Sequence, residues 1–289
     1  MPANDSEVVH IKFFGTRGSV PTPGQDTVRY GGNTCCVEVT WGENHRLIFD
    51  AGTGIRILGE RLSLNGTPPG RIDIAFSHLH WDHIQGLPFF IPMYINGVDI
   101  HLWGGGGKGV TLDLMMDHQL HSSFFPVGRA SLSANLLFHL ITPGHYEVSG
   151  GTLSVCATNH PGGCFAYRLD AVGKSIVYAT DRESDHGGDS DSKAKESALI
   201  EMAKGADLLI HDAQYTEDEY NKYRRGWGHS SFSDALRVAR AADISRLILF
   251  HHDPTHTDAF LESIEEHLKV ETSDIDELMM AFEGQIVLV

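Results

Sequence analysis

Residues 76–90, FSHLHWDHIQGLPFF, place three histidines and an aspartate within six positions, directly after an apolar run. Imidazole and carboxylate are the ligand types that suit Zn²⁺ and related first-row divalent ions. His78 and His80 are expected to project together toward one ion. Asp82 and His83, one turn later, would then reach a second ion. A lone histidine is more often an ordinary core or surface residue, but four ligand types in this register predict a metal site.

Two ions need further ligands, and polar residues recur in this chain where other apolar runs stop. The candidates are His160, Asp181, His211 with Asp212, and His251 with His252. Each of these, taken alone, is an ordinary strand-to-loop transition. Together they predict an active site on one rim of a sheet sandwich. Because side chains alternate along a strand, only one of His251 and His252 can be a ligand.

The elements that must position these residues are short strands bounded by Gly, Pro and Asn, followed by helical patterns. We expect strands at 8–14, 35–41, 46–50, 72–76, 152–158, 165–169, 175–180, 207–211 and 246–250. Helices are expected at 54–64, 86–95, 193–204, 231–242 and 258–270. Two strand-rich blocks, each ending in helices, predict an α/β fold, a four-layer αββα sandwich with mixed sheets. No segment resembles an interdomain linker, so one domain is expected over 1–289.

The composition narrows the class of partner. The formal net charge is −16 over 289 residues, which disfavours a large nucleic acid, because binding one requires a basic patch. A small phosphate-bearing substrate remains compatible when metal ions meet its charge. The four cysteines form no C-x-x-C motif and are too few for a disulfide framework. With neither a signal peptide nor a membrane-length apolar stretch visible, we expect a cytoplasmic protein without a membrane partner.

Several ordered segments resemble the metallo-β-lactamase superfamily, and more closely its ribonuclease Z-like phosphodiesterase branch. They are FSHLHWDHIQGLP, ITPGHYEVSGGTLSVCATNHPGGCFAYRLD, YATD, LLIHDAQY and WGHSSFSDALRVARAADISRLILFHHDP. The resemblance covers nearly the whole chain and implies the metallo-β-lactamase fold. It also implies a two-metal centre.

Carried over position by position, the resemblance assigns ligands to both ions. It gives one ion to His78, His80 and His160, the second to Asp82, His83 and His251, and makes Asp181 the bridge. Asp50, which closes the strand in LIFDAGTG, matches a buried carboxylate that anchors the ligand loop by hydrogen bonds. Zinc is expected from the ligand types. Manganese and iron stay open, because Asp82 and Asp181 make the second site richer in oxygen.

The same resemblance implies the catalytic roles. Two ions can share a bridging water and clamp the phosphoryl oxygens, and the leaving oxygen then needs a proton. His229, in GWGHSS, matches the general acid of the branch, oriented by Asp212, where the family has Glu. The alternative for His229 is a neighbour of a helix start capped by Ser230 or Ser231. The catalytic set is therefore His229, Asp212 and the ligand Asp82, and the GHS block favours phosphodiester over acyl chemistry.

The substrate expected is a small phosphodiester, most specifically a 3′,5′-cyclic nucleotide. Ribonuclease Z carries a long arm that grips tRNA, where this chain has only a short turn in YRLDAVGKSIVYATD. The N-terminal block FFGTRGSVPTPGQDTVRYGGNTCCVEV resembles bacterial and phage relatives that hydrolyse cyclic nucleotides. The alternatives are a ribosyl cyclic phosphate phosphodiesterase, a ribonuclease Z-like RNA endonuclease and a nucleotide-binding sensor without turnover.

Contacts to the substrate are assigned to a few side chains outside the ligand set. Phe124 or Phe125 would stack on a base, unless they pack under a loop. His256 would contact phosphate, and Asn33, with Arg17 and Arg29, would reach the mouth of the site. Relatives in this branch are commonly dimers, so a homodimer is expected.

Overall fold

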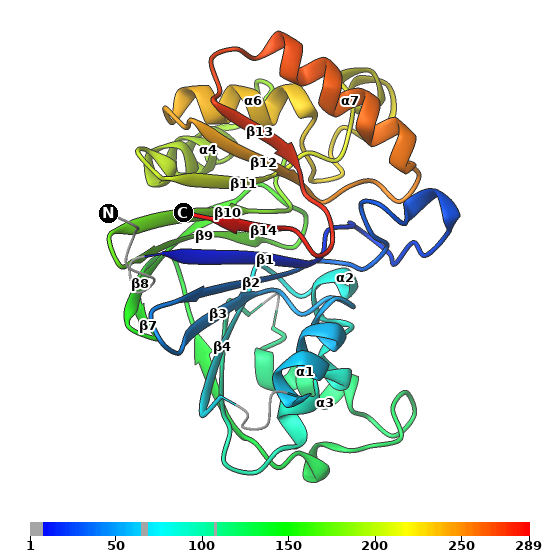
Figure 1. Ribbon diagram of the computed structural model, residues 1–289, viewed down its shortest axis with the longest axis vertical. Coiled ribbons are helices and arrows are strands. Elements are labelled where there is room, and N and C mark those ends of the chain that lie inside the picture. Colours follow the sequence, from blue (N-terminus) through cyan, green and yellow to red (C-terminus); the bar gives the residue numbers. More distant parts are fainter. Residues whose placement is uncertain (1–7, 65–68, 107–108) are drawn as a thin grey trace.

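The computed structural model describes residues 8–64, 69–106 and 109–289, and these residues form two sheets that lie face to face between helices (Figure 1). Each sheet has seven strands, in the orders β14-β1-β2-β3-β4-β5-β6 and β13-β12-β11-β10-β9-β8-β7. Both sheets mix antiparallel and parallel pairs, for example β1 with β2 and β3 with β4 in the first. The predicted αββα sandwich with mixed sheets is therefore confirmed.

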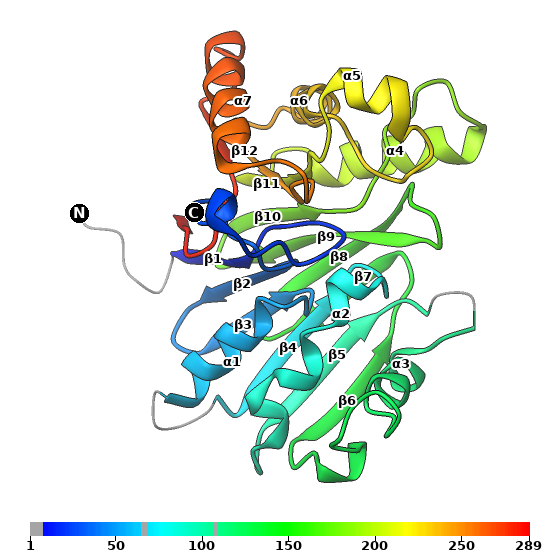
Figure 2. The ribbon, with the colours of Figure 1, turned by 90° about the vertical axis from the view of Figure 1, so that its right-hand side faces the viewer.

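The strands are β1 (Val9–Gly15), β2 (Cys36–Trp41), β3 (His45–Phe49), β4 (Arg71–Phe76), β5 (Asp99–Gly104), β6 (Asn135–Leu140), β7 (Gly144–Val148), β8 (Gly151–Thr158), β9 (Cys164–Ala171), β10 (Lys174–Ala179), β11 (Leu208–Asp212), β12 (Arg246–Phe250), β13 (Glu277–Met280) and β14 (Ile286–Leu288). The helices are α1 (Ile55–Leu64), α2 (Trp81–Ile84), α3 (Leu112–Gln119), α4 (Ser190–Ala203), α5 (Glu217–Glu219), α6 (Phe232–Ala241) and α7 (Asp258–Glu271). Figure 2 shows α1, α2 and α3 against the first sheet and α4, α6 and α7 against the second.

Three apolar clusters account for the layers. One fills the space between the sheets and includes Phe13, Phe49, Tyr178 and Phe250. The other two lie between each sheet and its helices. Strands covered on both faces are apolar at most positions, as in RLILF of β12, where the four residues after Arg246 are apolar and buried. This double burial explains why the central strands appear in the sequence as continuous apolar runs.

The parallel strands bring the polar strand ends together. β10, β11 and β12 are mutually parallel, so their carboxyl ends meet at one edge of the second sheet. β4, parallel to β3 and β5, ends at the facing edge of the first sheet. Polar residues that follow these strands therefore converge on one rim, where open α/β sheets commonly bind ligands.

One predicted helix is wrong, and several strands were not predicted. Segment 86–95 forms two 3-10 turns, Leu87–Phe89 and Ile91–Tyr94, after the one-turn helix α2. Pro88 and Pro92 lack the N–H that a continuous α-helix requires. The strands β5, β6, β7, β13 and β14 lie toward the sheet margins, where partial exposure weakens the apolar pattern. Within the described residues, no helix is long and apolar enough to cross a membrane.

Candidate metal centre

The HLHWDH segment leaves β4 as a loop and then winds into α2. His78 and His80 lie in the loop, and Asp82 and His83 lie on α2. His78, Asp82 and His83 are nevertheless buried. Burial of ionisable groups at such density costs solvation free energy unless they bind one another or a common partner.

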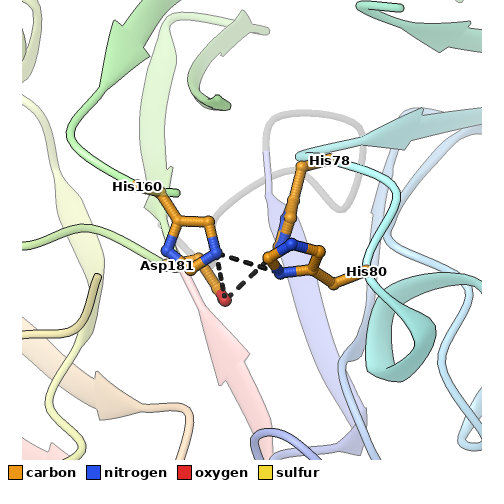
Figure 3. Close-up of side chains that lie close together, drawn as sticks. All are labelled: His78, His80, His160 and Asp181. Atoms are coloured by element: carbon orange, nitrogen blue, oxygen red, sulfur yellow. Dashed lines mark hydrogen bonds and ion pairs between the residues drawn. The ribbon is translucent and has the colours of Figure 1, made fainter. Parts of the chain in front are cut away.

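Three histidines and one aspartate form a first group of ligand atoms (Figure 3). Its members, His78, His80, His160 and Asp181, offer atoms that all lie within 4.8 Å of one another. Nε2 of His160 is 3.0 Å from Nδ1 of His80. Oδ2 of Asp181 lies 3.6 Å from Nε2 of His78 and 3.6 Å from Nε2 of His160. The ligand atoms of the four side chains therefore converge on one small volume.

A second group shares Asp181 with the first. Its members, again within 4.8 Å of one another, are Asp82, His83, Asp181 and His251. Oδ1 of Asp181 lies 3.1 Å from Nε2 of His83 and 3.0 Å from Nε2 of His251. Oδ2 of Asp82 is 3.2 Å from each of the same two nitrogens. Asp181 thus turns one carboxylate oxygen toward each group, which is the geometry of a bridging ligand.

The side chains present fit a divalent metal site. Nε2 of His78 is buried and has no hydrogen-bond partner in the described part of the chain. An unpaired buried nitrogen costs free energy, which coordination would remove. Imidazole nitrogens and carboxylate oxygens are also the donors that zinc and its neighbours prefer.

Both carboxylates are held in the ionised form that binds a cation. Burial alone would raise the pKa of Asp82, but the charge of His83 and the hydrogen bond from His251 lower it well below its usual value. Burial likewise opposes ionisation of Asp181, and there the neighbouring charges of His251 and His83 prevail and lower its pKa. Repulsion between the two ionised carboxylates is a further reason for this rim to attract cations.

Strained backbone positions aim several of these side chains. Asp50, Asp181 and His251 have φ values of 59°, 43° and 66°, a left-handed conformation that costs a non-glycine residue about 1 kcal/mol. His251 follows the last residue of β12, and this turn points its ring at the second group. His252 is buried elsewhere, with Nε2 2.7 Å from the carbonyl of Ala281. The structure therefore brings His251 to the site and leaves His252 out of it.

Asp50 anchors the ligand loop from beneath. Its carboxylate is fully buried and accepts from the backbone N–H of Ser77 at 2.7 Å. It also lies 2.8 Å from Nδ1 of His83 and accepts from the Tyr178 hydroxyl at 2.8 Å. Holding Nδ1 of His83 leaves Nε2 as the atom that faces the second group. The family resemblance predicted this anchoring role for Asp50. It did not predict the hydrogen bonds of Asp50 with Ser77 and Tyr178.

His229 lies beside both groups and is paired with Asp212. Its Nδ1 is 2.9 Å from Oδ2 of Asp212, so the aspartate reaches the ring although it is shorter than glutamate. Burial alone would lower the pKa of His229, but the charge and hydrogen bond of Asp212 raise it to about 9. Ser231, not Ser230, caps α6, and His229 precedes that cap. Of the adjacent pair at the end of β11, Asp212 faces the site, while Nε2 of His211 lies 3.2 Å from Arg182.

Four side chains expected at the substrate mouth have other partners. Arg17 is fully buried and donates to the carbonyls of Gly31, Asp253 and His256. Asn33 binds Glu283 through its backbone and side-chain nitrogens. Nε2 of His256 lies 3.0 Å from Oε1 of Glu219. The centroid of its ring lies 4.2 Å from the centroid of the Phe260 ring. Arg29 is exposed and pairs with Glu262. These contacts replace the substrate contacts expected of Arg17, Arg29, Asn33 and His256.

The two aromatic residues predicted to stack on a base are also not at the ligand groups. Phe124 is 81% exposed, and Phe125 packs edge-on against Phe89. The alternative, packing within a loop, fits Phe125. A contact that sequence did not indicate is the 2.9 Å approach of Nδ1 of His160 to the carbonyl of Gly228. The only available signal for it was the Gly-rich spacing of GWGHSS.

Comparison with known proteins agrees with this architecture. A family model described as a beta-lactamase superfamily domain matches residues 45–252. Ribonuclease Z of Staphylococcus epidermidis is 24% identical, over 84% of this chain and 88% of that protein. The metallo-beta-lactamase fold protein YhfI from Bacillus subtilis has a TM-score of 0.68 at 17% identity, covering 98% of this chain and 99% of that one. A diphosphatase from the PhnP family has a TM-score of 0.69 at 18% identity, covering 96% and 97%.

Two mixed sheets that gather histidines and aspartates at one rim define an αββα fold with a candidate metal centre. The chain belongs to the beta-lactamase superfamily, and at 24% identity it is similar to ribonuclease Z. The resemblance to the superfamily drawn from the sequence motifs is thereby confirmed.

Proposed function

We propose that this chain hydrolyses small phosphodiesters, with 3′,5′-cyclic nucleotides as its substrates. It is a metal-dependent phosphodiester hydrolase by class. The observation that carries the proposal is the continuity of the ligand groups with a proton donor. Asp181 and His251 of the ligand groups also lie within 4.8 Å of ligand-type atoms of Asp212 and His229.

The ligands divide between two ions as the geometry groups them. One ion would be held by His78, His80 and His160, the other by Asp82, His83 and His251, with Asp181 shared. When bound, such ions supply a water of lowered pKa and positive charge for the phosphoryl oxygens. Asp50 fixes the orientation of His83 in this arrangement.

His229 is the proton donor for the leaving oxygen. Asp212 keeps the proton on Nδ1 and fixes the plane of the ring, so Nε2 is the atom left for the substrate. The raised pKa of His229, about 9, keeps the imidazole protonated at neutral pH before the substrate arrives. A protonated donor is what departure of an alkoxide requires.

A small substrate is favoured by the connection between β9 and β10. Only Val172 and Gly173 separate the two strands, with φ values of 47° and 77° that are typical of a tight hairpin turn. No arm that could grip tRNA is inserted here. The net charge of −16 also disfavours long polyanions.

RNA is the second candidate substrate, because a relative at 24% identity is named ribonuclease Z.

We also propose zinc as the metal, because of the ligand types. We further propose a cytoplasmic location, and a homodimer from the resemblance to the ribonuclease Z-like branch.

The test is a substrate panel offered to the zinc- and manganese-loaded protein. It contains 3′,5′- and 2′,3′-cyclic mononucleotides, bis-p-nitrophenyl phosphate and a precursor tRNA, with His229→Ala alongside. His267→Ala is the matched control, since His267 is exposed on α7 and pairs with Glu271. We expect turnover of 3′,5′-cyclic nucleotides by the wild type and the control, with kcat reduced at least about a hundredfold in His229→Ala.

Other outcomes separate the alternatives. Cleavage of the precursor tRNA in preference to cyclic nucleotides would establish the ribonuclease function instead. Cyclic nucleotide retained stoichiometrically without turnover would establish a sensor. Undiminished turnover in His229→Ala would contradict the role of that residue.

A further inference from the structure

The imidazole ring of His251 turns its two nitrogens toward different partners. Nε2 lies 3.0 Å from Oδ1 of Asp181 and 3.2 Å from Oδ2 of Asp82, so it faces the second ligand group. Nδ1 faces away from that group. Its hydrogen-bond partner within the described residues is the side-chain amide of Gln214, whose Nε2 lies 3.2 Å from it. The amide of Gln214 therefore bears on which nitrogen of His251 carries the proton.

Gln214 is held in place against this ring. It follows β11 by two positions and is fully buried, and its backbone N–H donates to the carbonyl of Ser230 at 3.0 Å. The backbone of Gly18 covers the contact. A Cβ at Gly18 would lie 2.4 Å from Nδ1 of His251 and 2.5 Å from Nε2 of Gln214. Gly18 thus closes this side of the ring and keeps the amide in contact with Nδ1.

Two other histidines of the ligand groups indicate which atom Gln214 should present. Nδ1 of His83 lies 2.8 Å from a carboxylate oxygen of Asp50, and Nδ1 of His160 lies 2.9 Å from the carbonyl oxygen of Gly228. A neutral histidine that gives one nitrogen to a metal ion carries its proton on the other nitrogen, and that N–H needs an acceptor. By the same rule, His251 needs an oxygen beside Nδ1.

A half-turn of the terminal amide of Gln214 brings an oxygen to that place. Nε2 and Oε1 are similar in size and exchange positions in the turn, so the surrounding packing need not move. Oε1 is buried and has no hydrogen-bond partner in the part of the chain that the structure describes, so it gives up no bond. The hydroxyl of Ser19, 3.5 Å from Nε2, can donate as well as accept and suits either orientation.

We propose that Gln214 is a positioning residue for the second metal ion, with its Oε1 accepting a hydrogen bond from Nδ1–H of His251. This bond fixes the tautomer of His251 and leaves Nε2 as the ligand atom. The inference rests on the proposed assignment of His251 to the second ion and does not depend on the substrate. The turn at Gly18 and Ser19 supports both ligands, because the backbone N–H of Ser19 donates to Oδ2 of Asp82 at 2.7 Å.

Two variants separate an acceptor at position 214 from a donor. Gln214→Glu keeps the acceptor oxygens and loses the N–H donors, while Gln214→Met fills a similar volume with only a weak acceptor. Zinc affinity is measured by competition with a chromogenic chelator. We expect Gln214→Met to weaken the binding of one of two zinc ions about 10- to 100-fold, and Gln214→Glu to bind zinc at least as tightly as the wild type.

Gln285→Met is the matched control. Gln285 is 6% exposed, accepts from the backbone N–H of Phe282 at 3.1 Å and belongs to neither ligand group. Its substitution should leave both zinc affinities unchanged.

Nuclear magnetic resonance on the zinc-loaded wild type tests the hydrogen bond itself and needs no variant. Labelling with ¹⁵N-histidine reports the Nδ1–H protons, which are assigned through bond-mediated correlations to each residue's backbone. A proton bound to an oxygen acceptor resonates downfield of a free one. We expect the Nδ1–H proton of His251 to resonate as far downfield as that of His160, whose acceptor is also an amide carbonyl.

Unchanged zinc affinity in Gln214→Met overturns the inference while the two-ion centre stands. Equal losses in Gln214→Met and Gln214→Glu also overturn it, because the amide then acts by donation or by packing. If His251→Ala weakens neither zinc ion, the proposed ligand assignment fails, and the inference fails with it. None of these measurements involves turnover, so they are independent of the test with cyclic nucleotides.

Discussion

Asp50 shows, at the scale of single residues, how one buried carboxylate sets the orientation of a ligand. It holds the backbone of Ser77 and Nδ1 of His83 at once. Its own backbone is strained, at a φ of 59°. Strain of this kind persists where the surrounding structure compensates for it, and such positions cluster at functional sites.

We predict that Asp50→Asn weakens metal binding about 10- to 100-fold, because an amide must turn an N–H toward one of the donors that Asp50 now satisfies. Affinity is measured by competition with a chromogenic chelator. Asp73→Asn is the matched control: Asp73 is also fully buried but binds Arg71 and Trp103. Its substitution should lower stability and leave metal affinity unchanged. Equal loss of affinity in both variants would contradict the anchoring role.

At the scale of elements, the loop between α5 and α6 contacts the predicted metal ligand His160. Tyr220–Arg224 forms a π-helical turn, a feature frequent at functional sites, and the loop then reaches Gly228. Gly228 has a φ of 88°, and a Cβ there would lie 2.3 Å from Nδ1 of His160. Nearby Gly226 has a φ of 80° and nothing within 4 Å of its Cβ position.

These two glycines form a matched pair. Gly226→Ala should cost about 1 kcal/mol of unfolding free energy from backbone strain alone. Gly228→Ala should cost about 2 kcal/mol more, because the methyl group overlaps His160. It should also displace His160 and reduce metal stoichiometry. Denaturant unfolding and metal analysis check both; retention of full metal content by Gly228→Ala would be the contrary result.

Helix α4 is attached to the second sheet by an ionic cluster around Glu196. Arg182 donates to this carboxylate at 2.6 Å, and Arg237 donates to both oxygens at 2.8 and 2.9 Å. Burial alone would raise the pKa of Glu196, but the hydrogen bonds from Arg237 and the charge of Arg182 lower it from 4.5 to about 2. The native carboxylate therefore stays ionised at a pH where the unfolded one binds a proton.

The sign of the pH dependence follows. The stabilisation by Glu196 is fully present above pH 4.5 and is lost as pH falls toward 2. Glu196→Gln should lower the free energy of unfolding by about 2 kcal/mol at neutral pH. The difference in unfolding free energy between variant and wild type should become smaller as the pH falls from 4.5 toward 2. Urea unfolding at several pH values measures it. Glu60→Gln, in an exposed pair with Arg56, should cost less than about 0.5 kcal/mol at any pH. A difference that stays constant with pH would refute the assignment.

At the scale of the whole molecule, the ligands join elements that are distant in the chain. The first sheet contributes the 77–83 segment, and the second contributes His160, Asp181 and His251. An ion bound between them crosslinks the two sheets, and binding to the native state alone stabilises it.

Removal of metal should therefore destabilise the whole fold. At a free metal concentration about a hundredfold above Kd, the loss is about 3 kcal/mol, seen as a Tm lower by several degrees. Thermal unfolding with and without EDTA measures it. Asp181→Asn, which removes the shared ligand, should show a smaller EDTA effect. An identical EDTA response in wild type and variant would mean that the stabilising metal binds elsewhere.

The sequence by itself determined the fold class and the residues from which the site is built. HLHWDH is a local motif, and apolar runs followed by His or Asp mark buried parallel strands whose ends share a rim. Both signals depend only on residues near one another in the chain, so they can be seen without coordinates. The marginal strands β5, β6, β7, β13 and β14 lacked such a signal because they are less completely buried.

The family resemblance assigned His251 and Asp212 to the site, and only the tertiary structure decided how the backbone aims the ligands and what surrounds them. His251 rather than His252 reaches the site because the backbone turns left-handed beyond β12. His256 binds Glu219, 37 positions away in the chain, and Asn33 binds Glu283, 250 positions away. A cavity beside His80 is formed by α3 and the β8–β9 hairpin together. Contacts between distant segments depend on how the layers pack, and the local pattern of residues carries no record of that packing.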